Sequence, residues 1–245
     1  TWNGGRLRIL QASYSPSGTN GVNTQLTTLP ESFGNLSALT TLYLEWNSLF
    51  NLPQSFSQLT NLSSFTINNN WLIELPSDIG NLENLFFLDL GYNQLNAIPA
   101  SVCTMESLAY LYLFNNNLTS LPDCMCNLSI DWSGQDGGWN PYFASGGNYL
   151  CDDVPDCIAS SSYFESTLDQ FYYSVIEDAP QSCCTDEAAC NYDPSAYETD
   201  DNGSCEYPGD EGTEYEYECD CDGHYYDCAG MCGGDAMLDC AGECG

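Results

Sequence analysis

The chain has 245 residues, of which 35 are acidic and only two, Arg6 and Arg8, are basic, so its formal net charge is −33. This balance excludes binding to nucleic acid or to an anionic membrane surface through phosphate contacts, which need lysine and arginine. A cation or a basic partner suits the charge, although an acidic surface also serves solubility alone.

The first predicted elements are a short segment that is partly apolar, TWNGGRLRIL, and a loop rich in Gly, Ser and Asn over residues 13–25. A repeat follows, in which Leu29, Leu52, Leu75, Ile98 and Leu121 stand 23 residues apart and each precedes a proline. Stretches such as LYL and LDL alternate with period two, which predicts one short strand per repeat.

The inward residues of these strands are expected to stack into a continuous core that no single repeat builds alone. They are Leu42, Leu44, Phe65, Ile67, Leu88, Leu90, Leu111 and Leu113. An asparagine recurs at one site of each repeat, and we expect a structural role for it. The four are Asn47, Asn70, Asn93 and Asn116.

The pattern LPxxxxxLxxLxxLxLxxNxL resembles the extracellular, plant-like leucine-rich repeats. The resemblance implies an α/β-type solenoid with short parallel strands and a convex side that is mostly irregular or 3-10. It also suggests that residues 1–10 are the last part of an N-terminal cap, and we expect Thr1 to be a processed or truncated start. We assign residues 1–158 to this domain, with about five repeats.

The outward strand positions predict a concave binding face that is aromatic, with carboxylates and without a basic group. A carbohydrate, a peptide or a neighbouring subunit would suit such a face, whereas ordinary surface decoration is the alternative. The candidate residues are Tyr43, Trp46, Phe87, Asp89, Tyr92, Tyr110, Tyr112 and Phe114.

The last repeat carries cysteines, and the repeat register predicts their pairing. Cys103 and Cys126 differ by one 23-residue step, which would stack them about 4.8 Å apart on neighbouring coils. Aligning LPDC with VPDC puts Cys157 over Cys124 by the same reasoning. The predicted disulfides are therefore Cys103–Cys126 and Cys124–Cys157.

Three further segments follow the repeats. Residues 159–182 are expected to seal the end of the solenoid as a short helix or loop. Residues 183–208 resemble a module, CTDxxACNYxPxA…DxGSC, of secreted proteins from marine bacteria and protists. Residues 209–245 begin an array in which DCAGxCGGDAML runs for 12 residues from Asp227 and restarts at Asp239, resembling tandem tails of secreted microbial proteins. We expect small disulfide-rich modules here, mainly irregular or β.

The acidic modules offer hard oxygen ligands near glycine, which suits Ca²⁺. The alternative is that these side chains satisfy backbone donors in turns. The candidate ligands are Asp186, Asp193, Asp200, Asp201, Asn202, Asp220 and Asp222.

Cysteine usage predicts the compartment. Of the 15 cysteines, ten lie from Cys183 onward, a density typical of a disulfide scaffold in a secreted or cell-surface protein. Metal–thiolate clusters are disfavoured, because His224 is the sole histidine and no paired CxxC occurs. Sequons for N-glycosylation in a eukaryotic source stand at Asn35, Asn61, Asn117, Asn127 and Asn202. No apolar run in the sequence has transmembrane length.

An enzyme is not expected, because lysine, a second histidine and the nucleophile and phosphate-loop motifs are missing from the sequence. The favoured hypothesis is a secreted structural or adhesive protein of an extracellular filament, appendage or matrix. The repeat domain would adhere and the Cys/Gly repeats would form a shaft or spacer. The alternative is a recognition ectodomain or inhibitor that binds a glycan or protein through the concave face, with the Cys-rich part as a stalk.

Overall fold

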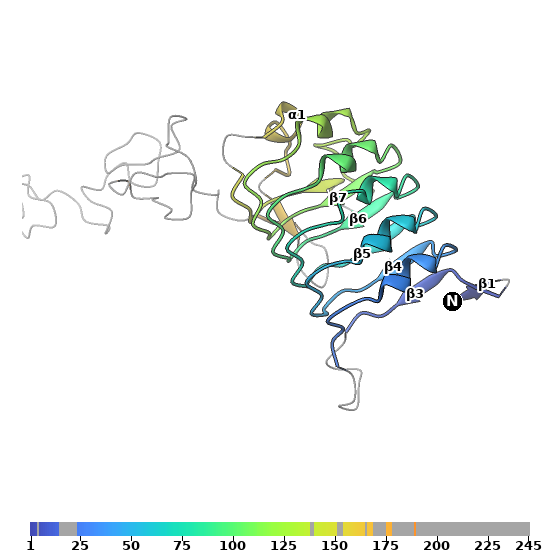
Figure 1. Cartoon of the computed structure of the whole chain (residues 1–245). Helices are drawn as coiled ribbons and strands as arrows, with labels where there is room; N and C mark the ends of the chain where they lie inside the picture. The colour runs from blue at the N-terminus through green and yellow to red at the C-terminus, as the bar shows by residue number, and fades with distance from the viewer. Residues whose placement is uncertain are drawn as a thin grey trace, which may run out of the picture. The chain divides into compact units, whose positions relative to one another are not determined.

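The computed structural model describes residues 1–3, 5–14, 24–137, 140–150, 154–164, 166–168, 175–177 and 189. The chain divides into two units, Thr1–Gln181 and Ser182–Gly245. The first is a leucine-rich-repeat solenoid, which confirms the predicted fold class (Figure 1). In the second, the description covers Ala189 alone.

One parallel sheet of six strands runs along the solenoid, in the order β3-β4-β5-β6-β7-β8. The strands are β3 (Ile9–Gln11), β4 (Thr41–Tyr43), β5 (Ser64–Thr66), β6 (Phe87–Asp89), β7 (Tyr110–Tyr112) and β8 (Phe143–Ala144). Leu42 pairs with Phe65, Phe65 with Leu88 and Leu88 with Leu111, so the sheet keeps the register of the sequence repeat. The last step is longer, from Leu111 to Phe143.

Two antiparallel pairs accompany this sheet. β1 (Trp2–Asn3) pairs with β2 (Arg6–Leu7) ahead of the first parallel strand. β9 (Ser166–Leu168) pairs with β10 (Val175–Glu177) after the last one. The predicted sealing segment therefore contains two strands, and the short helix α1 (Asp156–Ala159) precedes them.

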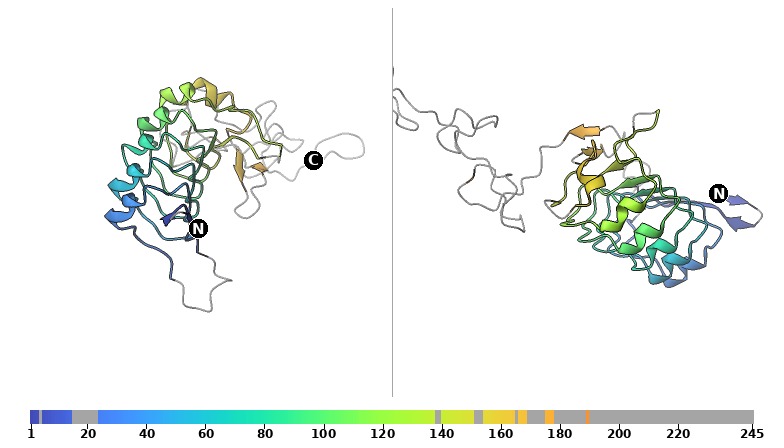
Figure 2. Two further views of the ribbon diagram at one scale, coloured as in Figure 1. Left: turned by 90° about the vertical axis from the view of Figure 1, so that its right-hand side faces the viewer. Right: turned by 90° about the horizontal axis from the view of Figure 1, so that it is seen from above.

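Short 3-10 helices form the convex side, opposite the sheet (Figure 2). They are η1 (Glu31–Asn35), η2 (Gln54–Gln58), η3 (Ile79–Asn81), η4 (Ala100–Thr104) and η5 (Asp123–Asn127). All except η3 start directly after a proline in the extended region. Proline fixes φ and has no N–H to lose, so it suits the position just before a helical turn.

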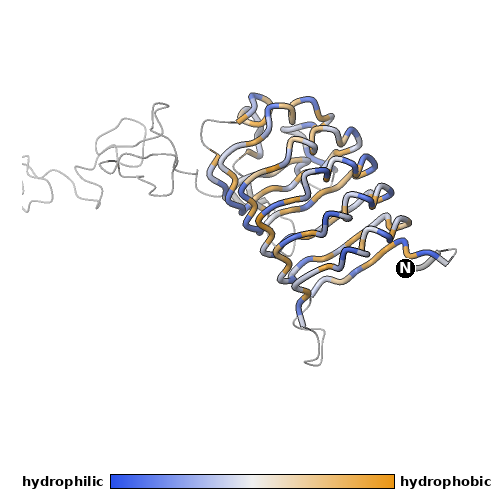
Figure 3. Tube along the Cα trace, viewed as in Figure 1, coloured by the Kyte–Doolittle hydropathy of each residue, from blue (hydrophilic) through white to orange (hydrophobic). Residues whose placement is uncertain are grey.

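The core fills the space between sheet and convex helices. The residues predicted to point inward on and just after β4 to β7 are all buried, which confirms their predicted place in the core. Hydrophobic positions recur at the same place in each coil (Figure 3). Since each coil buries its apolar side against its neighbours, stability is shared between adjacent repeats.

The repeated asparagines have the structural role that the sequence predicts. The Asn70 amide oxygen accepts from the Leu49 N–H at 3.0 Å, and its amide nitrogen donates to the carbonyls of Leu44 and Ile67 at 3.0 and 3.1 Å. Asn148 makes the same contacts in the longer last coil, where it accepts from the Leu118 N–H at 3.1 Å. These bonds satisfy backbone groups that turn away from the sheet.

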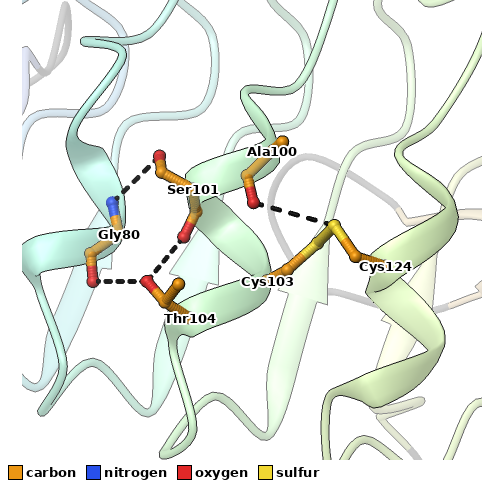
Figure 4. Close-up of a disulfide and its surroundings, with 6 residues drawn as sticks. All are labelled: Gly80, Ala100, Ser101, Cys103, Thr104 and Cys124. Carbon is orange, nitrogen blue, oxygen red and sulfur yellow. Dashed lines mark hydrogen bonds between the residues drawn. A yellow bond between two sulfur atoms is a disulfide. The ribbon is translucent and has the colours of Figure 1, made fainter.

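The predicted disulfide pairing is wrong. Cys103 is bonded to Cys124, with 5.7 Å between their Cα atoms (Figure 4). Cys126 is bonded to Cys157, again with 5.7 Å between Cα atoms. The two disulfides thus join η4 to η5 and η5 to α1.

The reason is that side chains meeting between neighbouring convex helices are not always 23 residues apart, whereas paired residues of β4 to β7 are. The Ser57 hydroxyl donates to the Asp78 carboxylate at 2.8 Å, and the Gly80 N–H donates to the Ser101 hydroxyl at 3.3 Å. Each contact joins residues 21 positions apart, which is also the separation of Cys103 and Cys124. On the convex helices, residues 23 apart occupy equivalent positions, and their side chains point in the same direction instead of toward each other. Cys103 and Cys126 are such a pair.

Candidate binding surfaces

The predicted binding face lies on and just beyond strands β4, β6 and β7. Phe87 and Asp89 belong to β6, and Tyr110 and Tyr112 belong to β7. Trp46 and Tyr92 both have left-handed backbone conformations, with φ of 61° and 52°. The structure brings these residues onto the sheet as the sequence predicts, but it does not leave them equally accessible.

The C-terminal part of this face is covered by the chain itself. Tyr112 and Phe114 are 1% and 2% exposed, and they form an apolar cluster with Ala144 and Leu168. The Tyr92 hydroxyl donates to the Leu168 carbonyl at 3.3 Å. Figure 2 shows β9 on the sheet side of the solenoid. Predicting Tyr112, Phe114 and Asp89 as exposed residues was therefore wrong: later segments pack on Tyr112 and Phe114, and Asp89 is buried as well.

Asp89 is a buried structural carboxylate. One of its oxygens accepts from the Asn68 amide at 2.5 Å, and the other accepts from the Gly91 N–H at 3.0 Å. Burial raises the pKa of the neighbouring Tyr112, and the negative charge of Asp89 adds to this shift. The Tyr112 hydroxyl donates to the Pro141 carbonyl at 2.9 Å. These groups hold the covered part of the sheet together.

The N-terminal part of the face is more open. Tyr43, Glu45 and Trp46 are partly exposed. Burial raises the pKa of Glu45, and a hydrogen bond from the Ser13 hydroxyl opposes that shift. The Gln25 amide donates to the Trp46 carbonyl at 2.9 Å. Two aromatic residues and one carboxylate that already accepts from Ser13 thus lie at this end of the face.

An aromatic edge, defined as Phe86, Phe87, Tyr110 and Tyr142, borders the covered region. Phe86 is 49% exposed, and its ring centroid lies 5.4 Å from that of Tyr110. Tyr110 and Tyr142 are 4.9 Å apart by the same measure. The Tyr110 hydroxyl donates to the Asp136 carboxylate at 3.3 Å, and burial and Asp136 together raise the pKa of Tyr110. Aromatic rings beside a carboxylate are suited to stacking on a sugar.

A second surface lies where the chain leaves the sheet toward the convex side. We define the flank patch as Phe50, Trp71 and Ile73, which are 46%, 49% and 47% exposed. The Phe50 and Trp71 rings meet edge to face at 5.4 Å. The Ile73 N–H donates to the Phe50 carbonyl at 3.3 Å, so the patch spans two adjacent coils.

The sequence reasoning missed the flank patch, although the repeat alignment contains the signal. Ser48, Gln94 and Asn117 occupy the position of Trp71 in other coils. Thr27, Asn96 and Thr119 occupy the position of Phe50 and Ile73. Large apolar residues at repeat positions that are polar in the other coils are not needed to build the repeat. They indicate a function of these two coils in particular.

In the part of the chain that the structure describes, the convex half carries two hollows of note. The larger, about 960 Å³, has polar and acidic walls that include Glu31, Asp78 and Glu83. The smaller, about 250 Å³, is lined by Asn51, Gln54, Glu74, Ser77 and the leucines and proline between them. In the described part of the chain, no three His, Cys, Asp or Glu side chains come together as a metal site. All the predicted Ca²⁺ ligands lie outside the described residues.

The sequons that the structure describes lie away from the strands. Asn35 and Asn127 are the last residues of η1 and η5, and both are exposed. Asn61 and Asn117 are exposed as well, and the Asn61 amide donates to the Ser37 carbonyl at 2.8 Å. Asn202 lies outside the described residues. Glycosylation at these asparagines stays a prediction.

Comparison with known proteins identifies the repeat. Residues 107–128 match the Leucine Rich Repeat family model. The chain is similar to the crystal structure of a plant ice-binding protein, with 28% identity and a TM-score of 0.43 over 52% of this chain and 40% of that one. It is also similar to a Leptospira interrogans LRR protein, with 25% identity and a TM-score of 0.29 over 60% of this chain and 48% of that one. No curated protein matches.

The family match supports a protein that contains leucine-rich repeats. The chain spans less than half the length of both structures to which it is similar. Its disulfides are consistent with a secreted protein. None of the helices in the described residues is long and apolar enough to span a membrane.

Proposed function

We propose that this chain is a secreted structural or adhesive protein of an extracellular filament, appendage or matrix. The solenoid is its attachment module, and the Cys/Gly repeats of residues 209–245 are a shaft or spacer. The solenoid attaches through protein contacts on its outer surface and does not enclose a small substrate.

The flank patch is the observation that carries this proposal. Its three large apolar side chains are each about half exposed on adjacent coils of an acidic protein. Exposed apolar clusters of this kind mark protein contacts. Meanwhile Tyr112, Phe114 and Leu168 fill part of the concave face from within the chain. A side-on contact therefore fits the solenoid better than engulfment of a ligand.

Electron microscopy of the purified native material, labelled with an antibody to the solenoid, tests this function. We expect ordered polymers or a matrix with the label at regular intervals. A dispersed monomer that binds a soluble ligand tightly would contradict the proposal.

Glycan recognition is the second candidate, and the aromatic edge favours it. Phe86 and Tyr110 offer ring faces next to Asp136, whose other oxygen accepts from the Asn140 N–H at 3.0 Å. Titration of the full chain with soluble oligosaccharides separates the two candidates. Under this alternative, Phe86→Ala abolishes binding, while Phe50→Ala on the flank patch leaves it unchanged.

Calcium binding by the acidic modules is a further part of the proposal, based on the spacing of Asp186, Asp193 and Asp200 to Asn202. Thermal melting of the full chain with and without a Ca²⁺ chelator tests it. An unchanged melting temperature on chelation would remove it.

A further inference from the structure

We propose that the flank patch and the smaller hollow beside it dock a basic protein segment, in which an arginine or lysine is flanked by apolar residues. This inference rests on the proposed attachment function and names the chemistry of the partner.

The patch and the hollow adjoin along the same two coils, and together we call them the strip. Asn51 directly follows Phe50, and Glu74 directly follows Ile73, and both line the hollow of about 250 Å³. Trp71 packs edge to face on Phe50, and the two rings belong to the same two coils that line the hollow. Apolar side chains of a partner would cover the patch while a longer side chain reaches into the hollow.

The acidic and aromatic residues of the strip favour a positively charged group at the end of that longer side chain. Glu74 is the charged residue among those that line the hollow. Aromatic faces attract ammonium and guanidinium groups, Trp most strongly, and a nearby carboxylate adds to that attraction. Arginine combines both modes, because its planar group stacks on rings and its donors pair with a carboxylate.

Charge complementarity indicates a different protein and not a second copy of this chain. The chain has no lysine, and Arg6 and Arg8 are its only basic side chains against 35 acidic ones. Two copies would bring like charges together, whereas a basic partner is attracted over a distance set by ionic strength.

The test measures binding of fluorescent peptides to the full chain by anisotropy. The probe is a peptide of two arginines set among leucine and phenylalanine. One matched peptide carries citrulline in place of arginine, which keeps the shape without the charge. The other keeps the arginines and carries serine in place of the apolar residues. We expect the probe to bind about tenfold tighter than either matched peptide, since the site needs both features.

Substitutions in the chain locate the site. Trp71→Ala is expected to weaken probe binding about tenfold or more, as truncation of an aromatic anchor does. Glu74→Gln is expected to weaken it about threefold to tenfold and to flatten its salt dependence, because one screened charge pair is lost. Gln94→Ala, in the column of Trp71, and Glu83→Gln, an exposed carboxylate lining the larger hollow, are the matched controls and should leave affinity unchanged.

Three results would overturn the inference. Equal binding of the arginine–serine peptide, or equal effects of Glu83→Gln and Glu74→Gln, would mean non-specific attraction to an acidic protein. A dimer in sedimentation experiments that Trp71→Ala dissociates would assign the patch to a second copy. Polymers in the native material together with no Trp71-dependent binding would defeat this inference while leaving the proposed function standing. Unchanged circular dichroism of each variant shows that the fold is intact.

Discussion

At the scale of single residues, each coil leaves the sheet through one backbone conformation that most side chains avoid. Trp46, Asn69, Tyr92 and Asn115 have φ between 52° and 61°, and Gly147 takes this place in the last coil with φ of 68°. The left-handed region costs non-glycine residues energy, and more so when the side chain is bulky. A buried asparagine directly follows each of them, and its amide bonds hold the turn.

Asn93→Ala tests the importance of this amide. Its oxygen accepts from the Leu72 N–H at 3.0 Å, and its nitrogen donates to the carbonyls of Ile67 and Leu90. Removing it leaves buried backbone groups without partners, so we expect a loss of about 2–4 kcal/mol in unfolding free energy. Chemical denaturation measures it. Asn84→Ala is the control, since Asn84 is exposed with one bond to Thr60 and should lose less than about 1 kcal/mol.

The raised pKa of Tyr112 leads to a prediction of how the unfolding free energy changes at high pH. Burial raises its pKa above the ordinary value of 10.0, so the folded state favours the neutral phenol. The stability that this shift contributes is complete below pH 10 and falls as the pH rises above it. We expect the unfolding free energy to decline above pH 10, and to decline less in Tyr112→Phe. An equal decline in both proteins would contradict the assignment.

At the scale of elements, the sheet and the convex helices follow different rules of stacking. Strands pair residue for residue at the repeat spacing, as Leu42 and Phe65 do. Between convex helices, the Ser57–Asp78 hydrogen bond and the Cys103–Cys124 disulfide join residues that are 21 apart, two fewer than the repeat. The cysteines follow the second rule because they lie in η4, η5 and α1.

A non-reducing peptide map should link Cys103 to Cys124. Replacing both by serine opens a link across 21 residues, which we expect to lower the unfolding free energy by about 3 kcal/mol. Denaturation of the double variant without reductant measures this loss. A peptide joining Cys103 to Cys126 would contradict the offset between convex helices.

The strands and core of this solenoid were predictable because the repeat is local. Leucines at fixed spacing define which side chains are buried, and the structure agrees at Leu88 and Leu111. Contacts between convex helices were not predictable, since the spacing alone does not give the direction of a side chain. The covering of Tyr112 by Leu168 was not predictable either, because Leu168 lies beyond the last coil and outside the repeat pattern.

At the scale of the whole solenoid, the predicted binding face is buried at its C-terminal end. Pro141 and Leu168 contact Tyr112 or Tyr92 from later in the chain. The surfaces that remain exposed include the N-terminal strands, the aromatic edge and the flank patch. A solenoid that fills part of its own concave side is better suited to attachment than to capture.

Leu168→Ala tests whether this covering stabilises the solenoid. Leu168 is fully buried against Tyr112 and Phe114, so its truncation should cost about 2–5 kcal/mol locally. Amide hydrogen exchange should accelerate over residues 110–114 and remain unchanged over β4. Ile73→Ala, at an exposed position, is the control for stability. Uniform acceleration along the solenoid would contradict a local cover.

The two disulfides make the two ends of the solenoid unequal in their resistance to force. The first cysteine in the sequence is Cys103, so every coil before it is held by non-covalent contacts alone. From η4 to α1, bonds at Cys103–Cys124 and Cys126–Cys157 join the convex side into one covalent block. Under tension we expect the coils ahead of Cys103 to unravel before the cross-linked ones, because stacked repeats contact only their neighbours. The cross-linked coils that follow act as a stop that limits the extension.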